Sequence, residues 1–298
     1  MSYHVPALLT KSVDGLEIKP DGVYVDVTFG GGGHSAEILK RLGSGRLIAF
    51  DQDEDAVANS INDERFTLLN QNFRFLRNNL LYLGLDKIDG LIADLGVSFH
   101  QFDVAERGFS FRFDGPLDMR MNRSGTLTAS KVLNEYEEER LAGIFFRYGE
   151  ITNSRAVAKA VISAREKSPL ITIGDLTGAV KPLVPPRVEN KFYAKLFQSL
   201  RIEVNRELEF LEEMLVQSLE MLRSGGRLVV ITYHSLEDRL VKNFIRSGSF
   251  SGDIEKDFYG NVVSPFIMIT KKAILVDDEE IAVNQRARSA RLRIAEKR

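Results

Sequence analysis

Short apolar runs alternate with helical segments through the first third of the chain. Four runs have the length and the β-branched or aromatic content of strands, and they cover residues 23–28, 46–50, 66–70 and 90–95. After the first run, residues 35–42 have helical spacing, and Gly43 ends them. Strands separated by helices are typical of a parallel sheet with helices on both faces. We therefore predict a doubly wound α/β domain.

This alternation stops near residue 106. The next segment is charged and helical in pattern, and prolines interrupt it at positions 169, 182, 185 and 186. We interpret it as a helical insertion over residues 106–194. The α/β domain would then consist of residues 1–105 and 195–298.

The α/β pattern resumes after the insertion. Apolar residues recur in steps of three and four from Leu196 to Leu222, which predicts one long helix that Gly225 and Gly226 end. A fifth strand over residues 227–233 then returns to the sheet. Residues 235–238 resemble a capping box that opens another helix. Two last strands are expected, over residues 262–274 and 290–296.

The turn after the first strand is rich in glycine. Gly30 to Gly33 stand between strand and helix, where glycines let the backbone turn sharply and approach a ligand closely. Asp51 lies 21 residues beyond Gly30, at the end of the second strand, where a carboxylate can accept hydrogen bonds from ribose hydroxyls. This arrangement predicts a ligand that contains adenosine.

Two ligands fit this turn. Residues 31–36 match the dinucleotide pattern G-x-G-x-x-A, which would make the chain a nicotinamide-dependent oxidoreductase. Asp26, just before the turn, favours S-adenosylmethionine instead, because a carboxylate is unfavourable beside a pyrophosphate. A nicotinamide enzyme would also leave the run from Asp94 to Ser98 without a use.

Asp94 follows the fourth strand, at the edge of the sheet where ligands gather in open α/β folds. Amino-methyltransferases place an acidic or amide side chain here. The exocyclic amine of a base is a poor nucleophile, and it needs an acceptor to hold its N–H and take the proton. Asp94 suits that task, although it could also cap the next turn or contact the cofactor alone.

Composition restricts the chemistry further. The chain has no cysteine, which excludes disulfides, thiolate metal sites and the cysteine adduct through which cytosine C5 is methylated. The four histidines are not paired at metal-ligand spacing, so we predict no catalytic metal. His34 stands in the glycine turn, and His234 follows the fifth strand, so both face the ligand edge of the sheet.

Charge and hydropathy bear on location and partners. The opening residues lack a basic region and a cleavage pattern, and no apolar run approaches the ~18 residues of a membrane span, so we predict a cytoplasmic protein without a membrane partner. The net charge of −2 does not by itself indicate a nucleic-acid partner. The last 15 residues, however, hold six basic side chains and one acidic one.

Many short motifs together show a resemblance to the bacterial 16S ribosomal RNA cytosine-N4 methyltransferase family. They occur in the family's order along nearly the whole chain, at residues 4–6, 28–35, 94–98, 105–111, 115–121, 197–198, 201–202, 234–239, 286–289 and 292–296. The resemblance implies a class I S-adenosylmethionine-dependent methyltransferase fold. Such a fold is Rossmann-like, with a mostly parallel seven-stranded sheet, and here it would carry an inserted all-helical domain for substrate recognition.

The resemblance also implies the reaction. It predicts S-adenosylmethionine-dependent N4-methylation of a cytosine in the decoding centre of 16S ribosomal RNA, within the 30S subunit. We expect Asp94 and His234 to be the catalytic residues. The positions that match the family's cofactor contacts are Gly32, Gly33, His34, Asp51, Phe73, Asp94 and Gln101.

The substrate cytosine must leave its stack to reach the methyl group. This chain has Phe99-His100 where the family has serine-proline, and Phe99 could stack on an extruded base. Five arginines are candidates for phosphate contacts, with intramolecular ion pairs as the alternative: Arg107, Arg120, Arg201, Arg288 and Arg291. A further alternative is an RNA-binding factor without catalytic activity.

Overall fold

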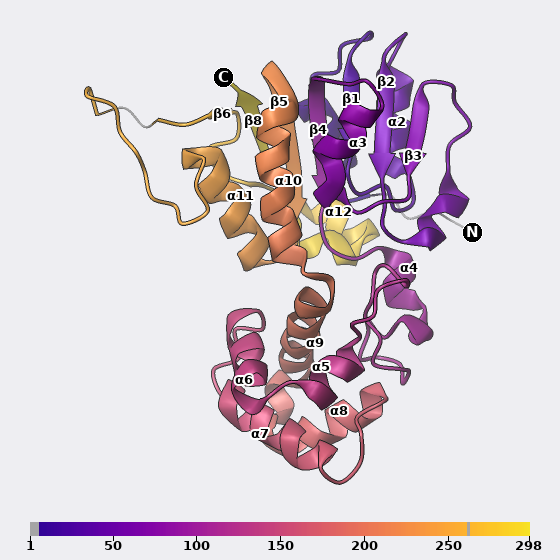
Figure 1. Ribbon diagram of the computed structural model, residues 1–298, viewed down its shortest axis with the longest axis vertical. Helices are drawn as coiled ribbons and strands as arrows, with labels where there is room; N and C mark the ends of the chain where they lie inside the picture. Colours follow the sequence, from indigo (N-terminus) through magenta and orange to yellow (C-terminus); the bar gives the residue numbers. More distant parts are fainter. Residues whose placement is uncertain (1–5, 261–262) are drawn as a thin grey trace. The chain divides into compact units, whose positions relative to one another are not determined.

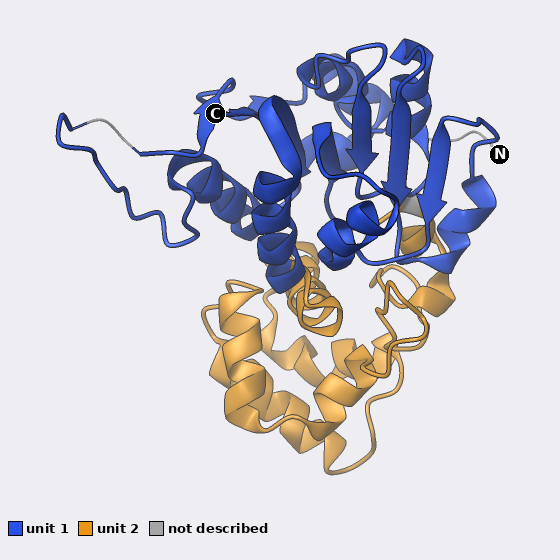
Figure 2. Ribbon diagram, turned by 45° about the horizontal axis from the view of Figure 1, so that its top comes forward, with its two compact units in different colours: residues 1–96, 208–298 blue, residues 97–207 orange. Residues whose placement is uncertain are grey.

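The computed structural model describes residues 6–260 and 263–298, with the side chain of Phe99 outside the description. The chain forms two compact units, which Figure 2 shows in different colours. Unit 1 contains residues 1–96 and 208–298, and unit 2 contains residues 97–207. The predicted insertion, residues 106–194, is shorter than unit 2 at both ends.

One mixed sheet forms the centre of unit 1 (Figure 1). Its order is β3-β2-β1-β4-β5-β8-β6, with β7 paired to β8 beside this path. The first five strands are parallel, and β8 runs antiparallel to β5, β6 and β7. The strands are β1 (Val23–Asp26), β2 (Arg46–Phe50), β3 (Phe66–Leu69), β4 (Ile88–Asp94), β5 (Leu222–Thr232), β6 (Phe266–Met268), β7 (Ile274–Leu275) and β8 (Arg291–Lys297).

Helices cover both faces of this sheet. Buried side chains of α3, α10 and α11 pack with one set of strand residues, and those of α1 and α2 pack with the other set. Neighbouring residues of β1 show the alternation, because Val25 belongs to the first cluster and Tyr24 to the second. The helices are α1 (Leu9–Gly15), α2 (Gly33–Arg41), α3 (Leu76–Tyr82), α10 (Glu207–Met221), α11 (Ser235–Ser247) and α12 (Asp278–Val283). The predicted fold class is confirmed.

Unit 2 is helical. It contains α4 (Phe99–Asp103), α5 (Ala129–Glu135), α6 (Glu138–Arg147), α7 (Ser154–Arg165), α8 (Ile173–Val180) and α9 (Glu189–Asn205). These helices surround a hydrophobic core of their own, centred on residues such as Leu133, Phe145 and Leu196. Within its described residues, this unit also has an isolated β-bridge between Pro116 and Thr172.

Several predictions about elements are wrong. The single helix through Leu196 and Leu222 is two helices, α9 and α10, separated by Arg206 in the left-handed conformation at φ 50°. Asn205, just before the break, uses its side chain to bond the backbone of Met119 and Met121. The apolar spacing continues across the break, so periodicity alone does not reveal it. Helix α10 ends at Met221, and Gly225 and Gly226 lie inside β5 instead of ending the helix.

The predicted strand over residues 262–274 is also wrong. Within its described part the structure has two short strands, β6 and β7, and residue 262 lies outside the described residues. Thr270 separates them, and its hydroxyl and amide both contact the backbone of Ile294 in β8. Pro265 precedes β6 and lacks the N–H that a longer strand would need. The other predicted strands lie where the structure has β1–β5 and β8, although β5 begins earlier, at Leu222.

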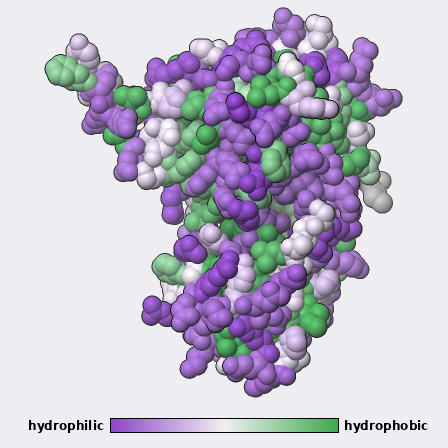
Figure 3. Space-filling view, in the orientation of Figure 1, coloured by the Kyte–Doolittle hydropathy of each residue, from purple (hydrophilic) through white to green (hydrophobic). Residues whose placement is uncertain are grey.

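Hydrophilic side chains cover much of the face seen in Figure 3. Among the helices of the described residues, none combines the length and the apolar character needed to cross a membrane.

Candidate functional site

The glycine turn joins the carboxyl end of β1 to the first turn of α2. Gly30 and Gly32 are left-handed, at φ 51° and 77°. A Cβ on Gly32 would lie 2.9 Å from the ring of Phe29, and one on Gly33 would overlap the ring of Pro6. Beside Gly30, by contrast, a Cβ would meet only the carbonyl of Thr28, at 4.0 Å. The turn therefore requires glycine, and it leaves open space at its tip.

Two aspartates hold this turn in place. Asp26 is buried and accepts hydrogen bonds from the Ser35 hydroxyl at 2.7 Å and from the Thr28 amide at 3.1 Å. Asp51 accepts the amide of Gly30 at 2.7 Å. Burial raises the pKa of both carboxyls to about 6, and these hydrogen bonds oppose the rise. Asp51 is half-buried at the end of β2, so it also remains accessible to a ligand.

His34 lies in the first turn of α2 and is buried. Burial lowers the pKa of its imidazole to about 4, so the ring is neutral near pH 7. Its Nδ1 lies 3.8 Å from Oδ2 of Asp94, and its buried Nε2 has no hydrogen-bond partner among the described residues. The backbone of Ala7 interacts with the same imidazole and opposes the fall of its pKa. Buried polar atoms in native structures almost always have a partner, so this backbone and a bound ligand are the two candidates for Nε2.

Asp94 ends β4, where it lies beside Ile231 of β5. Its amide donates to the Thr28 hydroxyl at 2.6 Å, and its Oδ1 accepts the Tyr233 hydroxyl at 2.8 Å. Burial raises the pKa of Asp94 to about 7, the hydrogen bond from Tyr233 opposes the rise, and the charges of Asp26 and Glu237 add to it. A partly exposed carboxyl with such a pKa is suited to accept a proton near neutrality.

No motif or spacing in the sequence points to Tyr233 as a site residue. A tyrosine directly after a strand is a common core residue, and its link to Asp94 depends on the pairing of β4 with β5. Both residues stand at the carboxyl ends of neighbouring parallel strands, which is the signal that pattern analysis would have needed.

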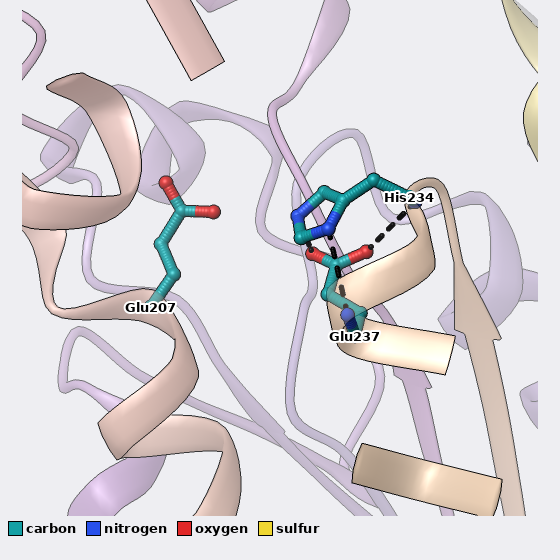
Figure 4. A group of neighbouring side chains, drawn as sticks. All are labelled: Glu207, His234 and Glu237. Atoms are coloured by element: carbon teal, nitrogen blue, oxygen red, sulfur yellow. Dashed lines mark hydrogen bonds and ion pairs between the residues drawn. The ribbon is translucent and has the colours of Figure 1, made fainter. Parts of the chain in front are cut away.

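His234 caps α11. Its Nδ1 accepts the Glu237 amide at 3.4 Å, and Glu237 in turn accepts the His234 amide (Figure 4). Glu237 also accepts the amide of Tyr233. The capping box thus begins at His234, and the prediction that Ser235 begins it is wrong by one residue. His234 and Glu237 are also metal-ligand types, so the absence of a metal stays a prediction. Glu207, also drawn in Figure 4, is the last residue of unit 2 and pairs there with Arg201 at 2.8 Å.

The remaining predicted cofactor contacts are Phe73 and Gln101. Phe73 begins a short 3-10 helix after β3, where it is half-buried against the core of unit 1. Gln101 belongs to unit 2, where it completes a capping box with Ser98 at the start of α4. Both assignments stay predictions.

The predicted RNA-binding arginines lie in very different surroundings. Arg107 is 2% exposed, and its guanidinium donates to the carbonyls of residues 120 and 121, so its side chain is not accessible to a phosphate group. Arg120 and Arg201 are paired with Asp118 and Glu207. Arg288 is exposed, and Arg291 is half-exposed at 3.4 Å from Asp238. For Phe99, the predicted stacking side chain lies outside the described residues.

The sheet, the glycine turn, Asp51 and Asp94 together define an S-adenosylmethionine-dependent methyltransferase of the class I, Rossmann-like fold. Residues 1–298 match the MraW methylase family. The chain belongs to that family. The predicted enzyme class and cofactor are therefore confirmed, and the nicotinamide-dependent oxidoreductase is set aside.

The relatives of this chain match it along its full length. A protein of Flavobacterium johnsoniae named ribosomal RNA small subunit methyltransferase H is 58% identical over 100% of this chain and 98% of its own. A protein of the same name from Bacteroides thetaiotaomicron is 57% identical over the same shares. Among solved structures, an rRNA methylase from Streptococcus thermophilus is similar over 99% of this chain and 99% of its own, with 13% identity and a TM-score of 0.45.

Proposed function

We propose that this methyltransferase transfers a methyl group to N4 of a cytosine in the decoding centre of 16S ribosomal RNA, within the 30S subunit and in the cytoplasm. The names of its relatives support the small-subunit RNA as substrate. The observation that carries the choice of an amine is the Asp94 carboxyl, held by Tyr233 at 2.8 Å with a pKa of about 7.

The residues around the glycine turn suit the cofactor. In unit 1 we assign the contacts to Gly32, Gly33, His34, Asp51 and Phe73, with Asp94 at the end of β4. The open space beside Gly30 and the unpartnered Nε2 of His34 support this assignment. When bound, S-adenosylmethionine supplies an electrophilic methyl group on a sulfonium. The contact assigned to Gln101 rests on the family resemblance.

Asp94 then performs the proton transfer. Its carboxylate accepts a hydrogen bond from the N4 amine, which orients the nitrogen lone pair. As the N–C bond to the methyl group forms, the sulfonium C–S bond breaks and the amine becomes acidic. The surplus proton passes from N4 to Asp94. The imidazole of His34, with a pKa of about 4, is a weaker base than the Asp94 carboxylate, with a pKa of about 7, so the carboxylate is the proton acceptor at this position.

His234 is the second predicted catalytic residue. Its imidazole is engaged with Glu237 at the start of α11, as close as 3.1 Å. It remains a candidate because it directly follows Tyr233, and an asparagine variant would separate its capping role from a role in the chemistry.

We further propose that unit 2 recognises the RNA. A groove of about 570 Å³ lies within this unit between α8 and the start of α9. Phe111 and Tyr193 line it, with ring centroids 5.8 Å apart, and so do the exposed cations Arg112 and Lys181. No ion pair of these two cations is recorded within the described residues. Unpaired cations beside aromatic rings are typical of surfaces that bind single-stranded RNA. An extruded base would be the substrate, with Phe99 as its predicted stacking partner.

One experiment tests the reaction and its substrate. The protein is incubated with S-adenosylmethionine labelled in the methyl group and with naked 16S RNA, undermethylated 30S subunits or single-stranded DNA, and the digested nucleosides are identified. We expect N4-methylcytidine, formed best with 30S subunits. Label in DNA or in another nucleoside contradicts the proposal, and unchanged function in Asp94→Ala favours the non-catalytic RNA-binding factor.

A further inference from the structure

Tyr233 stands between the end of β5 and the start of α11. Its hydroxyl donates to Oδ1 of Asp94 at 2.8 Å, and its ring packs beside the core of unit 1. Burial and the charge of Asp94 raise the pKa of Tyr233 well above its ordinary value, so the phenol stays protonated and donates. It is therefore a fixed donor and not an alternative base.

The backbone of the Asp94 loop is shaped around this ring. Gly96 has φ 101°, a conformation that favours glycine. A Cβ at this position would lie 3.3 Å from Cδ2 of Tyr233, so the ring occupies the space next to the glycine. The ring and the loop thus fix each other, and the hydroxyl meets the carboxylate in one geometry.

We propose that Tyr233 is a positioning residue for methyl transfer, which holds the Asp94 carboxylate in one orientation and favours its ionised form. This inference rests on the proposed function, in which Asp94 accepts the amine proton. The hydrogen bond occupies a lone pair of Oδ1 and fixes the plane of the carboxylate, which leaves Oδ2 to accept the amine.

The surroundings of Asp94 show why such a donor is needed. The negative charges of Asp26 on β1 and Glu237 on α11 both disfavour the ionised form of Asp94. Glu280 on α12 contributes a negative charge around Tyr233, and His34 on α2 is neutral. A hydrogen bond to the charged form is the remaining way to favour ionisation.

Tyr233→Phe tests the proposal, because it removes the hydroxyl and keeps the ring. In the free protein, the titration of the Asp94 carboxyl carbon is followed by NMR with 13C-labelled aspartate. We expect its midpoint to rise by about one to two pH units. The acid limb of kcat for methyl transfer to 30S subunits should move upward by the same amount. At pH 7 kcat should fall roughly tenfold, with KM for S-adenosylmethionine within about twofold of wild type.

Tyr24→Phe is the matched control. Tyr24 is a buried tyrosine of β1 whose hydroxyl accepts the Lys19 amide at 2.7 Å, so the same group is removed from the same sheet. It should leave the Asp94 titration and kcat unchanged. The proposal is overturned if Tyr233→Phe leaves the midpoint unmoved, or if both variants lower kcat equally in step with their melting temperatures.

The two proposals fail differently. If wild-type protein forms no N4-methylcytidine, the proposed function fails, and the NMR midpoint still shows whether Tyr233 controls the Asp94 carboxyl. If wild type forms the product and Tyr233→Phe matches it at every pH, the positioning role fails alone.

Discussion

Asp26, Asp51 and Asp94 are carboxyls near the ends of β1, β2 and β4, and each has a raised pKa. A carboxyl with a raised pKa binds its proton more tightly in the folded state than in the unfolded state. The contribution of these three carboxyls to the free energy of unfolding is therefore fully present below about pH 4, and it is lost as the pH rises through about 6 to 7. The charge that the proposed chemistry needs at Asp94 thus lowers the stability of the free protein near neutral pH.

Asp94→Asn should separate these two effects. We expect thermal unfolding to show a gain on the order of 2 kcal/mol at pH 8, and little change at pH 4.5, where the wild-type carboxyl is already protonated. Methyl transfer should fall by at least about 100-fold. An equal stability change at both pH values would show that Asp94 is not a buried charge in the folded protein.

His234→Asn tests the second predicted catalytic residue. Asparagine is a good N-cap, so it preserves the start of α11 while removing the imidazole. We expect kcat within about threefold of wild type if capping is the role, since the ring already contacts Glu237. His234→Ala, which lacks a capping oxygen, should lower the melting temperature. A loss of about 100-fold or more in the asparagine variant would instead make the imidazole catalytic.

Sequence patterns located elements better than they located their junctions. The strands β1 to β4 match the apolar runs within two residues, because buried strands need apolar side chains and so appear as apolar runs in the sequence. The break at Arg206 depends on the contacts of Asn205 with residues distant in the chain, so no local pattern contains it. The glycine turn could be predicted, because the left-handed conformation at positions 30 and 32 favours glycine and so leaves a visible run of glycines. Tyr233 could not be predicted, because it reaches the site only through the pairing of β4 with β5.

Gly32→Ala tests the turn as an element. The alanine would have to adopt φ 77°, and its Cβ would lie 2.9 Å from the Phe29 ring, so the turn has to shift. We expect S-adenosylhomocysteine to bind at least about tenfold more weakly by calorimetry. Gly84→Ala is the matched control: its φ is 73° and its Cβ meets nothing within 4 Å, so it carries a similar backbone strain of about 1–2 kcal/mol away from the turn. Equal loss of affinity in both variants would mean that the turn does not contact the ligand.

On the scale of the whole molecule, the two units divide the proposed tasks. Unit 1 contains the glycine turn, Asp94 and Tyr233, and unit 2 has a separate core and the groove with Arg112 and Lys181. The helical character of the insertion was visible in the sequence. Its limits were not, because unit 2 also includes α4 and the part of α9 that follows residue 194. Burial also determines which basic residues remain candidates for phosphate contacts. Arg107 is buried, and its burial cannot be predicted from composition.

Arg112→Gln with Lys181→Gln tests the groove. Removing two phosphate contacts should weaken binding of 16S RNA and reduce the slope of log affinity against log salt by about one to two. S-adenosylhomocysteine affinity should not change. Arg155→Gln with Lys159→Gln, two exposed cations of α7, is the control for net charge. An equal loss in both double variants would assign the effect to overall charge instead of the groove.

The most direct test of Asp94 as the proton acceptor is the pH dependence of a single turnover on undermethylated 30S subunits, with saturating S-adenosylmethionine. With Asp94 at a pKa of about 7, the rate of N4-methylcytidine formation should fall tenfold per pH unit below that value. The Asp94→Asn variant should show only a slow residual rate that does not depend on pH. A wild-type rate that stays constant from pH 5 to pH 8, or an Asp94→Asn variant that retains the wild-type profile, would contradict the account.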